Sequence, residues 1–282
     1  MSERFRTSVD IEGEDIHWSP EGGMSYGAYL KLDRILSAQA PLSDEHDELM
    51  FIVIHQASEL WLKLCLHELD AAIACVREDQ VRPAMKMLAR IARVQENLSQ
   101  SWSILATMTP ADYLKFRDRL GQSSGFQSFQ YRAMEYRLGN KNPAFAKVFK
   151  GEPEAERIVL GALRSPSLYD ETLRLAARMG LDVPAGKLER DWSEPYEASE
   201  AVEAMWREVY LDTRTWWELY EFAEKLVDLE QKFQQWRFNH MKTVERIIGF
   251  RRGTGGSGGV SYLVKALDIR LFPELWTVRT KL

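Results

Sequence analysis

The strongest constraint on the fold is a helical repeat of apolar side chains within residues 45–77. Apolar residues recur there at intervals that place them along one helix face, at Ile54, Trp61, Leu62, Cys65, Leu69 and Ile73. Helical patterns continue along most of the chain, and no segment shows the alternation typical of a half-buried strand. We therefore predict an all-α fold built by packing helix on helix.

Capping residues and turn residues divide this pattern into segments. The clearest helix start is the run from Thr109 to Asp112, which combines a Thr cap, a proline and an acidic residue in the first turn. The predicted helices cover 25–37, 45–77, 82–108, a segment from 110, 126–138, 143–149, 153–163, 167–179 and two helices within 198–249 that break near Asp212. Residues 179–193 are the expected excursion from the core. We predict a flexible tail at 1–22 and a single helical domain at 23–282.

Composition narrows the function classes. The 282-residue chain has a net charge of -5, whereas dedicated nucleic-acid binders are usually basic. No apolar run approaches the roughly 20 residues needed to cross a bilayer, and the polar N-terminus lacks a signal-peptide core. Helix geometry separates Cys65 and Cys75 by about 15 Å, too far for a disulfide. We expect a reducing, cytoplasmic location, with neither nucleic acid nor membrane as a partner.

His240 lies in an aromatic-rich helical stretch, with Trp236 and Val244 one turn away on either side. A histidine on a helix face is more often a satisfied structural residue than a ligand. As a ligand, His240 suits a haem better than another metal site, because HExxH and paired CxxC zinc signatures are absent from the sequence. A non-covalently bound haem needs only one or two axial side chains.

Two pairs of side chains share a helix face at one-turn spacing, Phe51 with His55 and Tyr113 with Arg117. Burying an unpaired imidazole in a core is costly, so a pocket wall explains His55 better than a core position. A guanidinium beside a phenol suits a carboxylate ligand. The charged neighbours of Arg117 also suit an ordinary solvated helix.

Residues 253–259 contain five glycines in seven positions. Most such stretches are flexible linkers. A phosphate-binding P-loop does not fit, because no Gly-Lys-Ser/Thr ends the run. The third reading is a loop that closes over a substrate, with Thr254 and backbone N–H groups binding charged ends.

Several longer blocks carry a family resemblance in a fixed order. They include residues 25–30, 46–63, 123–128, 131–132, 138–143, 236–241, 244, 248–250, 252–256 and 272–275. Together these blocks resemble the tryptophan 2,3-dioxygenase family, in its compact bacterial form, over about residues 22–280. The resemblance is weakest over about 150–200.

The resemblance implies a single-domain all-α bundle that encloses one haem b per chain, Fe(II) in the active form, and that assembles as a homotetramer. It implies cleavage of the indole C2–C3 bond of L-tryptophan with O2 to give N-formyl-L-kynurenine, the first step of catabolism through kynurenine. His240 matches the proximal haem ligand, and Ser124 and Gly125 match haem-binding positions. The substrate-binding positions implied are Phe51, His55, Tyr113, Arg117 and Thr254, with Tyr26, Tyr29 and Leu30 reaching in from a neighbouring subunit.

The weak acidity of the indole N–H group decides which role we expect for His55. Indole N–H is a very weak acid, so a histidine with an ordinary pKa near 6.5 is poorly matched to remove that proton. We expect His55 to orient substrate by hydrogen bonding, with a role as general base left open. Two alternatives also stay open: an indoleamine-type dioxygenase with broader substrates, and a helical scaffold whose aromatic faces bind partner helices.

Overall fold

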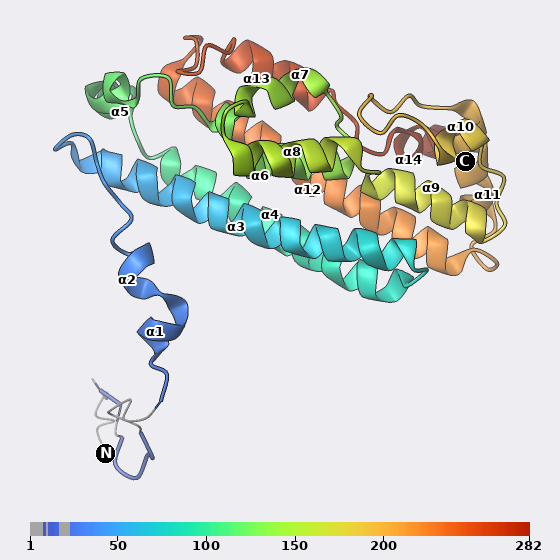
Figure 1. Ribbon diagram of the computed structural model, residues 1–282, viewed down its shortest axis with the longest axis horizontal. Coiled ribbons are helices and arrows are strands. Elements are labelled where there is room, and N and C mark those ends of the chain that lie inside the picture. The colour runs from blue at the N-terminus through green and yellow to red at the C-terminus, as the bar shows by residue number, and fades with distance from the viewer. Residues whose placement is uncertain (1–7, 10, 17–22) are drawn as a thin grey trace, which may run out of the picture. The chain divides into compact units, whose positions relative to one another are not determined.

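The computed structural model describes residues 8–9, 11–16 and 23–282, and every regular element within these ranges is a helix (Figure 1). The predicted all-α fold is confirmed. The chain divides into two compact units, residues 1–40 and 41–282, and each is described by itself. Most of the predicted tail, at 1–7, 10 and 17–22, lies outside the described residues, and the boundary at residue 22 stays a prediction.

The first unit contains two short helices, α1 (Tyr26–Leu30) and α2 (Leu32–Ile35). The hydroxyl of Ser25 caps α1 by accepting a hydrogen bond from the N–H of Ala28 at 3.2 Å. A single helix over 25–37 was the prediction, and it is wrong because Lys31 has a left-handed backbone with φ of 54°, which ends α1.

The second unit carries the remaining helices. They are α3 (His46–Arg77), α4 (Val81–Leu105), α5 (Pro110–Arg117), η1 (Asp118–Leu120), η2 (Gly125–Gln127), α6 (Phe129–Leu138), α7 (Pro143–Ala146), η3 (Lys147–Phe149), α8 (Pro153–Arg164), α9 (Leu168–Arg178), α10 (Ala185–Leu188), α11 (Glu200–Leu211), α12 (Trp217–Ile248), α13 (Val260–Leu267), α14 (Pro273–Thr277) and η4 (Val278–Thr280). Thr109 and Asp112 form the predicted cap as a reciprocal capping box. The predicted break near Asp212 is confirmed.

The long helices α3, α4 and α12 form the body of this unit, with α4 packed against both of the others (Figure 1). Helix α6 packs on α3 and α8, and α13 returns against α12. Helix α5 contacts α3 and α12 near one end of the body, while α9, α11 and α14 gather near the other. The two ends of the same long helices therefore have different neighbours.

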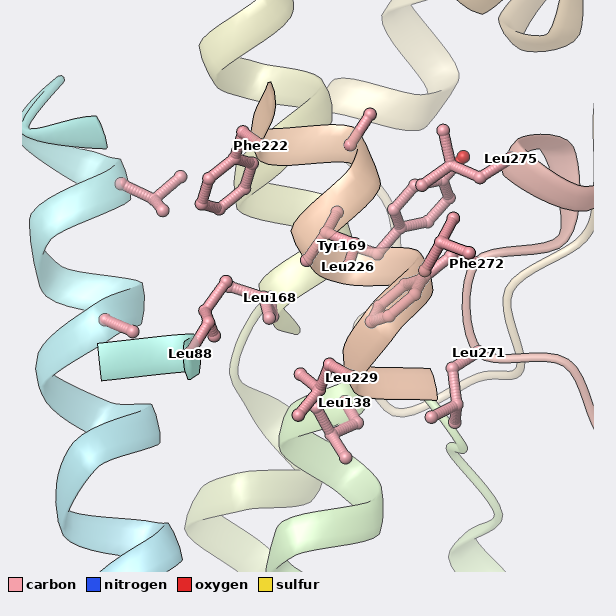
Figure 2. Close-up of a cluster of buried hydrophobic side chains, with 14 of the residues drawn as sticks. Leu88, Leu138, Leu168, Tyr169, Phe222, Leu226, Leu229, Leu271, Phe272 and Leu275 are labelled. Atoms are coloured by element: carbon pink, nitrogen blue, oxygen red, sulfur yellow. The ribbon is translucent and has the colours of Figure 1, made fainter. Parts of the chain in front are cut away.

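The main hydrophobic core joins side chains from α4, α6, α9, α12 and the C-terminal segment (Figure 2). The labelled members are all at most 2% exposed: Leu88, Leu138, Leu168, Tyr169, Phe222, Leu226, Leu229, Leu271, Phe272 and Leu275. Leu181 and Val183 also belong to this core. The prediction that 179–193 leaves the core is therefore wrong for its first part, because apolar side chains there return to the interior.

Two buried carboxylates hold the C-terminal segment in place. Glu274 accepts hydrogen bonds from the hydroxyls of Tyr169 and Tyr196 at 2.8 and 2.7 Å. Glu230 accepts from the backbone N–H groups of residues 271 and 272 at 2.9 and 3.0 Å. These bonds compensate the cost of burying each carboxylate.

Candidate functional site

A smaller apolar cluster lies where α3, α4, α5 and α12 meet. Its buried members are Ile54, Leu105, Met108, Tyr113, Phe116 and Ile247, with Phe51 and Trp102 packed against them. This cluster is separate from the main core. Several residues that the sequence predicts to be functional lie on the same four helices: Phe51 and His55 on α3, Tyr113 and Arg117 on α5, and His240 on α12.

His55 makes a hydrogen bond that determines which ring nitrogen carries its proton. Its Nδ1 lies 2.7 Å from the backbone carbonyl oxygen of Phe51. Since a carbonyl oxygen only accepts, the neutral ring carries its proton on Nδ1 and has a lone pair on Nε2. Burial lowers the pKa of His55, which favours this neutral form at pH 7. The rings of Phe51 and His55 are 4.2 Å apart, as their one-turn spacing predicts.

His240 lies between two tryptophan rings. The Trp102 ring stacks on its imidazole at 4.6 Å with an 18° interplanar angle, and the Trp236 ring is 5.4 Å away. Burial lowers the pKa of His240 to about 4, with a further lowering from His55. His240 is therefore a neutral imidazole at pH 7, with a lone pair available to a metal.

Trp102 is a site residue that sequence reasoning missed. It lies on α4, far along the chain from His240 on α12, and no local motif marks it. Tryptophan at helical spacing is usually a core residue, so only the packing of α4 on α12 reveals its contact with His240.

Tyr113 and Arg117 lie together, as predicted. Burial raises the pKa of Tyr113, and the guanidinium of Arg117 lowers it in part. The Tyr113 ring is 6.0 Å from Phe51 and 5.4 Å from Phe116. Arg117 Nη2 donates to the carbonyl oxygen of Arg252 at 3.0 Å, which links α5 to the start of the glycine-rich loop.

The glycine-rich loop packs on the segment that contains Ser123 and Ser124. The hydroxyl of Thr254 donates to the carbonyl oxygen of Ser123. A Cβ added to Gly255 would lie 2.6 Å from Cβ of Ser124, so only glycine permits this approach. The loop therefore connects the predicted haem-binding positions, Ser124 and the adjacent Gly125, to Arg117, which is predicted to bind the amino-acid end of the substrate.

The residues fit a haem held by one imidazole. Within the described residues, no group of three or more His, Cys, Asp and Glu side chains could hold a metal ion. Two buried donors, Nε1 of Trp102 and Nε of Arg117, have no hydrogen-bond partner in that same part of the chain. Buried donors of this kind suit anionic ligand groups. Trp102, which stacks on His240, suits a carboxylate of haem, and Arg117 suits the carboxylate of a second ligand.

The structure thus gathers most of the predicted site around the small cluster. Phe51, His55, Tyr113, Arg117, Ser124, Gly125, Thr254 and His240 all belong to the second unit. Tyr26 and Tyr29 belong to the first unit, where they are 77% and 71% exposed, and Leu30 is half-buried.

Comparison with known proteins covers nearly the whole chain. The family profile of tryptophan 2,3-dioxygenase matches residues 13–164 and 153–282. A tryptophan 2,3-dioxygenase of Bacillus cereus is 56% identical over 272 residues, which covers 96% of this chain and 98% of the relative. Tryptophan 2,3-dioxygenase 1 of Ralstonia nicotianae is 58% identical over 259 residues, covering 92% and 88%. The Bradyrhizobium diazoefficiens protein of the same name is 57% identical over 257 residues, covering 91% and 92%.

Proposed function

Because the chain belongs to the tryptophan 2,3-dioxygenase family, an oxidoreductase family that depends on haem, we propose that His240 is the proximal ligand of one haem b per chain, Fe(II) in the active form. The reaction is oxidation of L-tryptophan with O2 to N-formylkynurenine. Because members of this family are enzymes, the alternative function as a helical scaffold for partner helices is excluded. When bound, the haem supplies the dioxygen chemistry. The protein binds and orients the substrate.

The neutral imidazole of His240 between two tryptophan rings supports the ligation of haem. The observation that carries the substrate-binding part of the proposal is the lone pair that the Phe51 carbonyl leaves on Nε2 of His55. Indole N–H is a donor, and a neutral Nε2 is an acceptor matched to it. Removal of that proton is unfavourable, since burial lowers the pKa of His55 and makes it a weaker base. His55 therefore holds the indole in position, and Phe51 forms the aromatic wall beside it.

The other end of L-tryptophan is a charged amino acid. Arg117 and Tyr113 supply a guanidinium and a phenol hydroxyl for its carboxylate. Arg117 Nε is buried without a partner in the described part of the chain, so it has a donor to spare. Thr254 closes over the same end through the loop that Ser123 anchors. A bound substrate thus contacts both the α5 helix and the loop.

We further propose that the protein is a homotetramer in which Tyr26, Tyr29 and Leu30 enter a neighbouring subunit's pocket. Helix α3 supports this arrangement. Of the described helices, it alone is long and apolar enough to cross a membrane, so the expectation that no apolar run approaches that length is wrong for α3. Only 17% of its most apolar stretch is buried within the chain. Leu49, Val53 and Leu60 are 49%, 45% and 53% exposed along α3, and a second copy of the chain would cover them.

A cytoplasmic location completes the proposal. Cys65 and Cys75 are both free thiols, which is compatible with a reducing compartment. The apolar stretch of α3 does not contradict it, because core and interface helices reach the same length and apolarity. Helix α3 also packs along α4, α6 and α9 within the second unit.

The test compares two histidines. His240→Ala should lose most of its haem or shift its spectrum to a different axial ligation, measured by absorption of the purified ferrous protein, because it removes the proposed proximal imidazole. His67→Ala, an exposed position on α3, is the matched control and should keep full haem content. Full haem content and an unchanged ferrous spectrum in His240→Ala would refute the ligand assignment.

His55→Ala separates orientation from base catalysis in the same assay. We expect it to keep haem and measurable turnover while L-tryptophan binding or rate decreases. Complete inactivity with haem, dioxygen and L-tryptophan binding all intact would show that His55 acts as an obligatory base.

A further inference from the structure

A buried ionic network lies behind the aromatic wall of His240. Glu135 of α6 accepts hydrogen bonds from Nη1 of Arg132 and, at 2.7 Å, from Nη2 of Arg237 on α12. Tyr131 and Asn140 also donate to Glu135, each at 3.1 Å. The three charged side chains are only 3–5% exposed. The network is therefore removed from solvent.

The network carries more positive than negative charge. It contains two guanidinium groups and one carboxylate, and Tyr131 is uncharged because burial raises its pKa. Glu230 lies two turns before Arg237 on α12, but its carboxylate accepts the backbone N–H groups of residues 271 and 272. The guanidinium of Arg132 lies 4.2 Å from the centre of the Phe145 ring, which favours a buried cation.

Short aromatic contacts connect this network to His240. The Tyr131 ring is 5.1 Å from the Trp236 ring, and the Trp236 ring is 5.4 Å from His240. Arg237 is the next residue after Trp236 on α12, and its guanidinium lies over the Phe233 ring at 4.5 Å. Aromatic rings lie between the buried charges and the imidazole, so the field of the network is weakly screened there.

We propose that the Arg132–Glu135–Arg237 network tunes the haem toward its reduced form through its surplus positive charge. The inference rests on the proposed ligation by His240. Ferrous iron carries one positive charge less than ferric iron, so a nearby buried cation favours the ferrous state. Arg237 also donates to the carbonyl oxygen of Ala266 at 3.2 Å, which fixes the network against α13.

The experiment measures the midpoint potential of the haem-loaded protein by spectroelectrochemistry. Arg132→Met removes the surplus charge and should lower the potential. Glu135→Gln removes the only carboxylate of the network and should raise it. Opposite shifts identify electrostatics, because general loosening of the site would move both variants in the same direction. Arg157→Met is the matched control, since the side chain of Arg157 is 71% exposed on α8. The haem midpoint potential of this variant should equal that of the wild type.

A conservative variant and a second readout complete the test. Arg132→Lys keeps the charge and should restore the wild-type potential, so the Arg132 pair decides the question even where Glu135→Gln does not fold. Haem content and the ferrous iron–histidine Raman band report on His240 in the same samples. Shifts of equal sign in Arg132→Met and Glu135→Gln, or no shift in Arg132→Met with that band unchanged, would overturn the tuning role while leaving the ligation intact.

Discussion

The two halves of α12 differ in what surrounds them. In the first half, Leu219, Phe222 and Leu226 are 0% exposed and belong to the main core. Figure 2 shows Phe222 and Leu226 within it. In the second half, His240 is half-buried and Phe238 is 48% exposed. One continuous helix thus serves as a core element at one end and as part of the site at the other.

The polar groups near each half show the same difference. Glu230, in the first half, is satisfied by two backbone N–H groups of the chain itself. Beside the second half, Nε1 of Trp102 and Nε of Arg117 are buried without partners among the described residues. The buried carboxylate of the first half is satisfied within the chain, although Nε1 of Trp276 in the main core is also buried without a partner among the described residues. The unpartnered donors beside the second half lie close to His240 and Tyr113, where they suit a ligand. Substitutions in the two halves should therefore separate stability from binding.

The largest expected effect is on stability. Phe222→Ala should reduce the free energy of unfolding by about 3–5 kcal/mol, because it leaves a cavity in a fully packed core. Chemical denaturation of the haem-loaded protein measures this loss, with Phe238→Ala as the control, because Phe238 is an exposed side chain of the second half. Equal losses in both variants would show that the two halves do not differ.

The next effect is on binding. Arg117→Ala should make the binding free energy of L-tryptophan less favourable by about 1.5–3 kcal/mol, the typical value of a charge-assisted hydrogen bond. Tryptamine lacks the carboxylate, so its affinity should hardly change. Titration of both ligands into the ferrous protein tests this, and equal losses for the two would reject Arg117 as the carboxylate ligand.

Lys141 should make the stability of the folded protein depend on pH, through its contacts at the end of α8. Its Nζ donates to the carbonyl oxygens of Ala162, Leu163 and Ser165 at the end of α8. Burial lowers the pKa of Lys141 to about 7 from 10.5, and Asp170 offsets this in part. Between these two pH values the unfolded chain binds more protons than the folded one, so stability contributed by Lys141 rises with pH.

Denaturation of wild type and Lys141→Met from pH 7 to pH 10 measures this contribution. The free energy of unfolding of the wild type should rise by roughly 1–3 kcal/mol relative to the variant over this window. Parallel curves would mean that Lys141 does not titrate there.

The smallest effect should come from Thr254. Thr254→Val removes the hydrogen bond to Ser123 and should make the binding free energy of L-tryptophan less favourable by about 0.5–1.5 kcal/mol. Ser261→Ala, which removes a hydroxyl bonded within its own turn, is the control. Hydrogen exchange across 250–259 should slow when L-tryptophan is added to the wild type. No slowing at saturating ligand would show that substrate does not order the loop.

Sequence patterns predicted the helices well because their signals are local. The capping box at Thr109 and the break near Asp212 each depend on a few neighbouring residues. The errors arose where backbone conformation or distant packing decided the outcome. Lys31 divides a predicted helix by a left-handed conformation, and Leu181 returns to the core from a segment rich in turn residues.

The sequence by itself determined the all-α class, the one-turn pairs Phe51–His55 and Tyr113–Arg117, and the family to which the chain belongs. These features are carried by spacing within a helix or by the order of blocks along the chain. Tertiary structure alone decided that Trp102 stacks on His240, that Gly255 packs on Ser124 and that Glu135 joins Arg132 to Arg237. Each of these contacts joins different elements or depends on how they pack, and helical periodicity specifies a face of a helix without specifying which helix will cover it.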